Sequence, residues 1–193
     1  MKLFLVRHGQ TEANLNRIYS GQRDVMLTDN GRAQAVAIRP VLANMKFDRV
    51  YSSDLTRAIE TQRLALPGVE GVRTPLLREI DAGRAGGCPF GQVPGAPEGW
   101  NSRKDPDPYV KVGGESFAQL TERLRCFLKQ LEEDPCDRVA VFAHNGIIGS
   151  MMRIVLGDQL DRRAFVADNC SIHVFEFDGT GWKILAWNYM REF

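Results

Sequence analysis

Two short apolar runs limit what this chain can fold into. The segments "KLFLV" (2–6) and "RVAVF" (138–142) are mostly apolar and show no alternation with polar residues. Runs of this kind are typical of strands that are buried on both faces, as in a parallel sheet covered by helices. The segment "FDRVYSS" (47–53) predicts a further strand. The chain is therefore expected to contain a parallel sheet as its centre.

Segments with helical periodicity lie between these runs. "LTDNGRAQAVAIRPVLANM" (27–45) places Thr28 where it can cap a helix, and "ESFAQLTERLRCFLKQLEE" (115–133) carries an apolar stripe. Near the end of the chain two β-rich runs flank "DGTG" (178–181), which predicts a hairpin. The expected fold class is α/β, a three-layer α/β/α sandwich with a mostly parallel central sheet and an antiparallel C-terminal hairpin.

The length and the charge pattern narrow the choice of function. A chain of 193 residues suits one domain, 1–193, in which the glycine- and proline-rich stretch 83–114 has no period and predicts an irregular, lid-like insertion. The net charge is +1 with the charges interspersed, which argues against a nucleic-acid partner. The apolar runs are too short for a signal peptide or a membrane span, so a cytoplasmic protein is expected. The oligomeric state stays open.

Basic residues follow three of the predicted strands. Arg7 and His8 come after 2–6, His144 comes after 138–142, and Arg57 lies just past 47–53, in a helix that Ser53 could cap. The carboxyl ends of parallel strands meet at one edge of a sheet, so these side chains are expected to converge. Converging cations repel one another unless an anion lies between them, and guanidinium groups bind phosphate oxygens well. The helix after His144 would direct its first free N–H groups at the same anion.

Other phosphatase chemistries lack their motifs. No cysteine is followed six positions later by arginine, no GxxxxGK loop is present, and the three histidines are not accompanied by paired carboxylates. The four cysteines form no CxxC pair, so free thiols are expected rather than a zinc site. The chemistry is therefore expected to need neither a metal nor a cofactor.

Five motifs in order carry a family resemblance. They are "RHGQTEAN" (7–14), "SSDLTRAIET" (52–61), the glutamate of "LLREIDAG" (76–83), "GGES" (113–116) and "HNG" (144–146). Together they resemble the histidine phosphatase superfamily, also called phosphoglycerate-mutase-like. The stretch 7–35 is particularly similar to α-ribazole phosphatases and related broad-specificity phosphatases.

The resemblance implies a metal-independent phosphatase acting through a phosphohistidine. His8 would attack phosphorus with a neutral Nε2, kept neutral by the charges of Arg7 and Arg57. Glu79 would protonate the leaving group, with Asp81 as the alternative because spacing alone does not distinguish them. The implied contacts to the phosphoryl group are Arg7, Arg57, His144, Asn14 and Asn145, and those to the substrate are Ser20 and Gly21.

The substrate is expected to be a small phosphate monoester, with α-ribazole 5′-phosphate as the leading candidate. The alternatives are a cofactor-dependent phosphoglycerate mutase and a non-catalytic phosphate-binding regulatory module. "IDAGRAGGCPFG" (80–91) lacks the basic cluster that mutases use for the substrate carboxylate, and it also departs from the "WEG"-like turn of many relatives. Four ring-bearing residues are expected to be mainly structural: Phe90, Trp100 and Tyr109 in the insertion, and His173 in a predicted strand.

Overall fold

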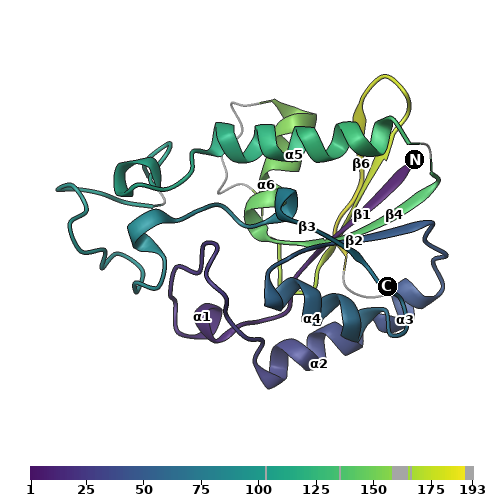
Figure 1. Ribbon diagram of the computed structural model, residues 1–193, viewed down its shortest axis with the longest axis horizontal. Helices are drawn as coiled ribbons and strands as arrows, with labels where there is room; N and C mark the ends of the chain where they lie inside the picture. Colours follow the sequence, from purple (N-terminus) through teal and green to yellow (C-terminus); the bar gives the residue numbers. More distant parts are fainter. Residues whose placement is uncertain (103, 135, 158–164, 166, 190–193) are drawn as a thin grey trace.

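The computed structural model describes residues 1–102, 104–134, 136–157, 165 and 167–189. In this part of the chain a six-stranded sheet has the order β3-β2-β4-β1-β5-β6 (Figure 1). The strands are β1 (Lys2–Arg7), β2 (Arg49–Ser53), β3 (Val72–Thr74), β4 (Arg138–Ala143), β5 (Ile172–Phe177) and β6 (Trp182–Tyr189). Strands β1 to β4 pair in parallel, whereas β5 is antiparallel to both β1 and β6. The predicted fold class is confirmed, and β3 is a short edge strand that the sequence analysis did not identify.

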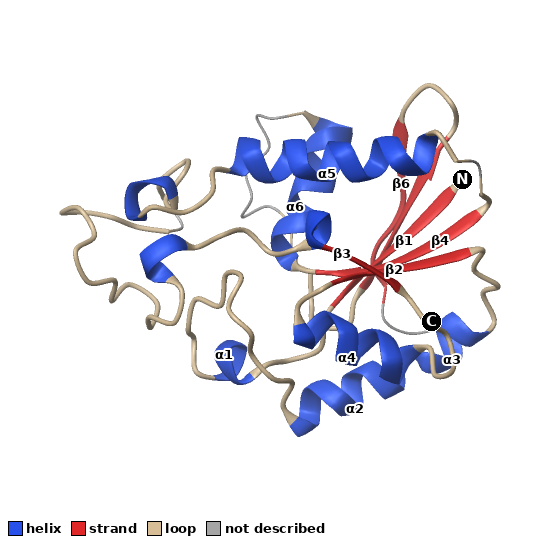
Figure 2. Ribbon diagram, in the orientation of Figure 1, coloured by secondary structure: helices blue, strands red, loops and turns tan. Residues whose placement is uncertain are grey.

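Helices cover both faces of the sheet (Figure 2). One layer contains α2 (Asp29–Ala37), α3 (Arg39–Ala43) and α4 (Thr56–Ala65), and the other contains α5 (Phe117–Glu132) and α6 (Asn145–Leu156). A short helix, α1 (Glu12–Leu15), lies outside these layers, and three single 3₁₀ turns are η1 (Pro75–Leu77), η2 (Gly83–Ala85) and η3 (Val110–Val112).

The two central strands are buried on both faces. Leu3 and Leu5 of β1 pack with α5 and α6, whereas Phe4 and Val6, on the opposite face, pack with α2, α3 and α4. Strand β4 follows the same alternation, because its residues pair in register with those of β1. Burial on both faces explains why neither run alternates apolar with polar residues.

Side chains cap two of the helices, and the cap at Thr28 is the predicted one. Thr28 caps α2 by accepting a hydrogen bond from the N–H of Gly31, and Ser116 forms a capping box with Gln119 at the start of α5. The predicted segment 27–45 is divided into α2 and α3 at Ile38, two residues before a proline in the first turn of α3. Proline has no N–H to continue the ladder of α2, which accounts for the break.

The segment 83–114 is irregular apart from η2 and η3, and it extends away from the sheet near α1 (Figure 1). A separate small cluster anchors it, with Tyr19, Ala82, Ala85 and Val112 buried and Trp100 and Tyr109 packed against them. The irregular character agrees with the sequence, and the lid role stays a prediction.

Three further expectations concern the cysteines, His173 and membrane-spanning helices. The four cysteines are free thiols, and burial raises the pKa of Cys170 to about 12. His173 is fully buried in β5, where its ring nitrogens bond to Ser171 and to the backbone N–H of Asn188. It therefore has the structural environment that its strand position indicates. No helix in the described residues has both the length and the apolar character needed to cross a membrane.

Candidate active site

A cavity of about 280 Å³ opens at the carboxyl edge of the sheet. The three central parallel strands end there at equivalent positions, because Arg7 at the end of β1 pairs with Ala143 at the end of β4 and Ser52 near the end of β2 pairs with Phe142. Eight of the nine residues predicted from the sequence line it: Arg7, His8, Asn14, Ser20, Gly21, Arg57, Glu79 and Asn145. The strand-end argument therefore places these residues together as expected.

His8 lies at the first position after β1 and is almost completely buried. Its Nδ1 is 2.7 Å from the carbonyl oxygen of Gly9, which can only accept, so Nδ1 carries the proton and Nε2 keeps its lone pair. Burial, with the nearby guanidinium groups of Arg57 and Arg7, lowers the pKa of His8 well below its ordinary value. The imidazole is therefore neutral at pH 7, with one nitrogen available as a nucleophile.

The backbone around His8 is held from three directions. The N–H of Gly9 donates to Oγ1 of Thr61 on α4 at 3.0 Å, and Nδ2 of Asn169 donates to the carbonyl of His8 at 3.0 Å. A Cβ atom at Gly9 would overlap the carbonyl of Gly31 at the start of α2. The loop thus lies against two helices at a distance that only glycine allows, and this contact limits movement of the imidazole.

One buried and one partly buried arginine flank the imidazole. Arg57 is 1% exposed and donates to the carbonyls of Gly21 (2.8 Å) and Arg23 (2.9 Å), while Arg7 donates to the carbonyl of Ala167. Burial lowers the pKa of Arg57 to about 10 and also lowers that of Arg7, in each case against the opposing effect of the Glu79 carboxylate. Both remain charged at pH 7. Each has a buried Nε with no partner among the described residues, which suits an anion in the cavity.

The carboxylate of Glu79 lies at the N-terminus of α6. This corrects the expectation that the first N–H groups of that helix are free to bind the phosphate. Its Oε1 accepts hydrogen bonds from the N–H of Gly146 (3.0 Å) and of Ile80 (2.9 Å). The N–H of Gly146 therefore binds a carboxylate of the protein rather than pointing free at a phosphate, since the positive end of a helix attracts the nearest anion. A Cβ atom at Gly146 would lie 2.1 Å from Oε1, so the glycine of "HNG" makes this contact possible.

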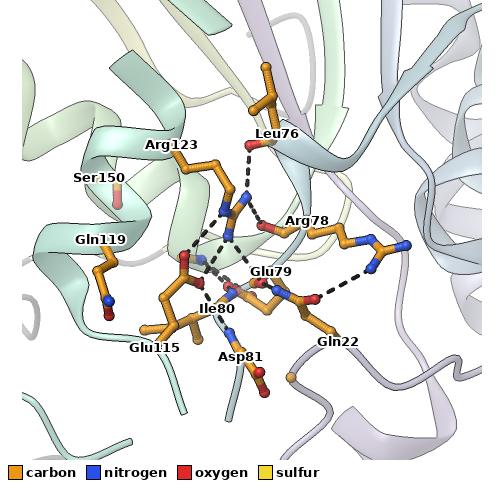
Figure 3. Close-up of polar contacts among 12 residues, drawn as sticks. Gln22, Leu76, Arg78, Glu79, Ile80, Asp81, Glu115, Gln119, Arg123 and Ser150 are labelled. Carbon is orange, nitrogen blue, oxygen red and sulfur yellow. Dashed lines mark hydrogen bonds and ion pairs between the residues drawn. The ribbon is translucent and has the colours of Figure 1, made fainter. Parts of the chain in front are cut away.

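A partly buried ion pair holds the segment that carries Glu79 (Figure 3). Arg123 on α5 donates to the carbonyls of Arg78 (2.9 Å) and Glu79 (3.4 Å). The same guanidinium binds both carboxylate oxygens of Glu115, at 3.1 and 3.0 Å. Glu115 also accepts from the N–H of Asp81 at 3.2 Å. Arg123 and Glu115 thus hold the backbone on both sides of Glu79, which gives the glutamate of "GGES" a positioning role.

The structure separates the two acidic candidates that the sequence left open. Glu79 lines the cavity, whereas Asp81 does not. The side chain of Asp81 is exposed and accepts a hydrogen bond from the N–H of Gly83 at 2.9 Å. The neighbouring Arg78 forms a two-point ion pair with Asp54 of "SSDLTRAIET" at 2.8 and 2.7 Å, which lowers the pKa of Asp54. The segment is therefore tied to the turn before α4 as well as to α5.

His144 is the one predicted residue that does not line the cavity. It is fully buried, with its ring centroid 5.2 Å from that of His8 and its Nε2 2.8 Å from Oγ of Ser53. Burial is the main reason that its pKa lies well below the usual value. The predicted cap at Ser53 is wrong, because Leu55 is the N-cap of α4 and the serine hydroxyl contacts His144 instead.

The rest of the cavity is mainly apolar, and most of its residues were not predicted. Phe90 and Tyr109 line it, but Trp100 does not and donates its indole N–H to the carbonyl of Pro108. The further lining residues include Ile18, Tyr19, Ile80, Phe117, Ile148, Met152, Arg153, Phe165 and Trp187. On α6 the spacing Asn145, Gly149, Arg153 marks one helix face, so this part could have been inferred by extending the helix from "HNG".

The sequence model of the histidine phosphatase superfamily (branch 1) matches residues 3–190. The chain belongs to the histidine phosphatase superfamily. Members of this superfamily with a phosphatase activity hydrolyse phosphate monoesters, and this histidine phosphatase is such a hydrolase.

Individual relatives cover most of this histidine phosphatase. The adenosylcobalamin/alpha-ribazole phosphatase of Salmonella typhimurium is 31% identical over 174 residues, which are 81% of this chain and 80% of that protein. Phosphoglycerate mutase-like protein 4 of Arabidopsis thaliana is 33% identical over 196 residues, 96% of this chain and 84% of that protein. Among solved structures, a mycobacterial glucosyl-3-phosphoglycerate phosphatase in complex with VO3 has a TM-score of 0.84 and 29% identity, covering 97% of this chain and 98% of its own.

Proposed function

We propose that this histidine phosphatase transfers the phosphoryl group of a phosphate monoester to Nε2 of His8 and then to water. The observation that carries the proposal is the state of His8, which is neutral, protonated on Nδ1 and placed in the cavity beside two arginines. Attack by Nε2 on phosphorus forms a phosphohistidine and releases the alcohol. One difficult displacement is thereby divided into two easier steps.

The phosphoryl group is bound at the polar end of the cavity. The guanidinium groups of Arg7 and Arg57 stabilise charge on its oxygens during transfer, and the amides of Asn14 and Asn145 supply further donors. His144 supports the site from behind the imidazole of His8, where the Ser53 hydroxyl orients its ring.

Glu79 acts as the general acid and then as the general base. It is the only carboxylate among the described residues that line the cavity, and its Oε1 is already held by two backbone N–H groups. Oε2 has only one longer contact, 3.3 Å to the N–H of Gly146, so it is the oxygen that gives a proton to the leaving alcohol and later accepts one from the attacking water. The contacts of Arg123 and Glu115 keep it at the boundary between the polar and apolar parts of the cavity.

The leaving group lies in the apolar part, with Ser20 and Gly21 at its edge. A small phosphate monoester with a ring-bearing leaving group fits this wall, and α-ribazole 5′-phosphate is the first candidate because the Salmonella relative carries its name. A phosphoglycerate mutase uses a cluster of basic residues to bind the carboxylate of its substrate. Besides the two arginines at the phosphate, the described lining residues include one further arginine and no lysine, so this function is less well supported.

Three features of the whole chain belong to the same proposal. The chain forms a single domain, 1–193, in which segment 83–114 contributes Phe90 and Tyr109 to the cavity and acts as its lid. The protein is cytoplasmic and does not bind nucleic acid, in keeping with its net charge of +1. Catalysis needs no metal, since the arginines supply the positive charge.

The test is to trap the intermediate. Rapid quench with radiolabelled substrate should yield an acid-labile, base-stable phosphoenzyme in the wild type and none in His8→Ala, which should lose turnover but keep its fold. Steady turnover without a phosphoenzyme would refute covalent catalysis and, with it, the role of His8. Excess EDTA should leave the rate unchanged, and a loss of activity that Mg²⁺ or Zn²⁺ restores would contradict the metal-free mechanism. Absence of any turnover would favour a phosphate-binding module.

A further inference from the structure

The charges around the cavity are not balanced by a phosphate monoester alone. Among the described residues, the charged side chains that line it are Arg7, Arg57, Arg153 and Glu79. A phosphate dianion at the polar end is matched by Arg7 and Arg57, and Glu79 carries its proton to the leaving group. Arg153 then remains as a cation at the wall of the leaving-group part.

The surroundings of Arg153 are apolar and aromatic. Its guanidinium carbon lies 5.4 Å from the ring centroid of Phe117, and the described lining residues around the same part of the cavity include Tyr109, Met152 and Trp187. Its Nε is buried and has no hydrogen-bond partner among the described residues. A partly desolvated cation without an acidic partner is unfavourable, so a ligand that supplies an anion would be bound strongly there.

The distance between the two positive regions follows from α6. Arg153 is eight residues beyond Asn145, so their Cα atoms are about 12 Å apart at about 1.5 Å per residue. Gly149 lies between them on the same helix face, and a Cβ atom there would meet nothing within 4 Å. The helix therefore leaves open space between the phosphate end and Arg153.

We propose that the substrate carries a second anionic group, a carboxylate or a phosphate, and that Arg153 binds it. An apolar or aromatic spacer on the order of 10 Å long joins this group to the reacting phosphate, passes over Gly149 and packs against the aromatic wall. This inference rests on the proposed phosphatase function and narrows its substrate class, so it disfavours α-ribazole 5′-phosphate, which has no second anionic group. It makes Arg153 a specificity-determining residue whose contact to the substrate is distant from the reacting atoms.

The experiment uses substrates that differ in the distance between the phosphate and the second anionic group. A series of ω-carboxyalkyl phosphates of increasing chain length is compared with the matching series of neutral carboxamides, and the ratio of the two kcat/KM values is measured at each length. The variants are Arg153→Met, which removes the charge but keeps an apolar side chain, and Arg153→Lys, which keeps the charge. Arg125→Met is the matched control, because Arg125 is exposed on α5 and does not line the cavity.

In the wild type the ratio should rise to about 10- to 100-fold at one chain length, because a hydrogen bond to a charged group is worth about 1.5–3 kcal/mol. Arg153→Met should bring the ratio close to one at every length, Arg153→Lys should keep part of it, and Arg125→Met should retain the wild-type profile. A wild-type ratio that does not depend on length, or one that survives in Arg153→Met, would overturn the inference and leave Arg153 as a structural partner of Phe117.

A binding measurement separates this inference from the proposed function. The ω-hydroxy carboxylates, which are the leaving alcohols of the series, contain no phosphate, and their dissociation constants can be measured by calorimetry without turnover. The alcohol of the preferred length should bind the wild type about tenfold or more tightly than it binds Arg153→Met. If turnover fails but this difference is found, the anion site stands and the phosphatase mechanism fails. If turnover proceeds but the difference is absent, only the anion site fails.

Discussion

Gly146→Ala is the substitution that tests the placement of Glu79 most directly. The new Cβ atom would lie 2.1 Å from Oε1 of Glu79, whereas real Cβ contacts do not fall below 3.0 Å, so the carboxylate must retreat by about 1 Å. The Oε1 contact to the N–H of Gly146 at 3.0 Å would lengthen with it. The methyl group itself adds no charge and leaves every catalytic side chain chemically intact.

The effects on stability should partly cancel. Alanine gains about 1 kcal/mol over glycine inside a helix, while a weakened hydrogen bond to a carboxylate costs about 1.5–3 kcal/mol. The net loss of about 0.5–2 kcal/mol corresponds to a Tm lower by on the order of 1–8 °C. The effect on catalysis should be larger, because a displacement of about 1 Å in a catalytic group costs on the order of 100-fold in rate.

The assay compares an alkyl phosphate with p-nitrophenyl phosphate, whose leaving group needs no proton. The kcat for the alkyl substrate should fall about 100-fold, and that for p-nitrophenyl phosphate should change little. Gly149→Ala serves as the control for the Tm alone, because it also adds a methyl group to α6 without a neighbour within 4 Å but lies in the cavity wall. If Gly146→Ala lowers kcat by the same factor for both substrates at an unchanged Tm, the contact between Gly146 and Glu79 does not position a general acid.

Four further substitutions test Glu79 against Asp81, the phosphate contact of Arg57 and the buried His173 outside the site. Glu79→Gln should slow alkyl phosphates by about 10²- to 10⁴-fold more than p-nitrophenyl phosphate, whereas Asp81→Asn should not, and equal losses for the two substrates in Glu79→Gln would contradict the acid role. Arg57→Ala should lower kcat/KM by similar factors for both substrates and weaken inhibition by vanadate. Unaltered inhibition would show that Arg57 does not bind the phosphate. Burial lowers the pKa of His173 to about 4, so the unfolded chain binds the proton first as the pH falls. The stability from this residue is therefore complete above about pH 6.5 and is lost toward pH 4, by up to about 3 kcal/mol, and urea unfolding of His173→Asn should show a correspondingly smaller decrease over that range.

The sequence by itself determined the elements and the polar end of the cavity. Strands β1 and β4, the hairpin of β5 and β6, and the cap at Thr28 depend on patterns within a few residues, and such local preferences act wherever the segment lies. Arg7, His8 and Arg57 could be placed together because the carboxyl ends of parallel strands always meet at one edge. Strand β3 was not predicted, because two exposed residues and one half-exposed residue carry no such pattern.

Only the tertiary structure decided between residues that look equivalent along the chain. Glu79 and Asp81 are two positions apart, and what separates them is the N–H of Gly146, far away in sequence, together with the ion pair of Arg123 and Glu115. Arg153 reaches the cavity because α6 packs on the sheet with one particular face. These contacts join distant segments, and their geometry depends on how side chains fill the space between layers, which no local pattern specifies.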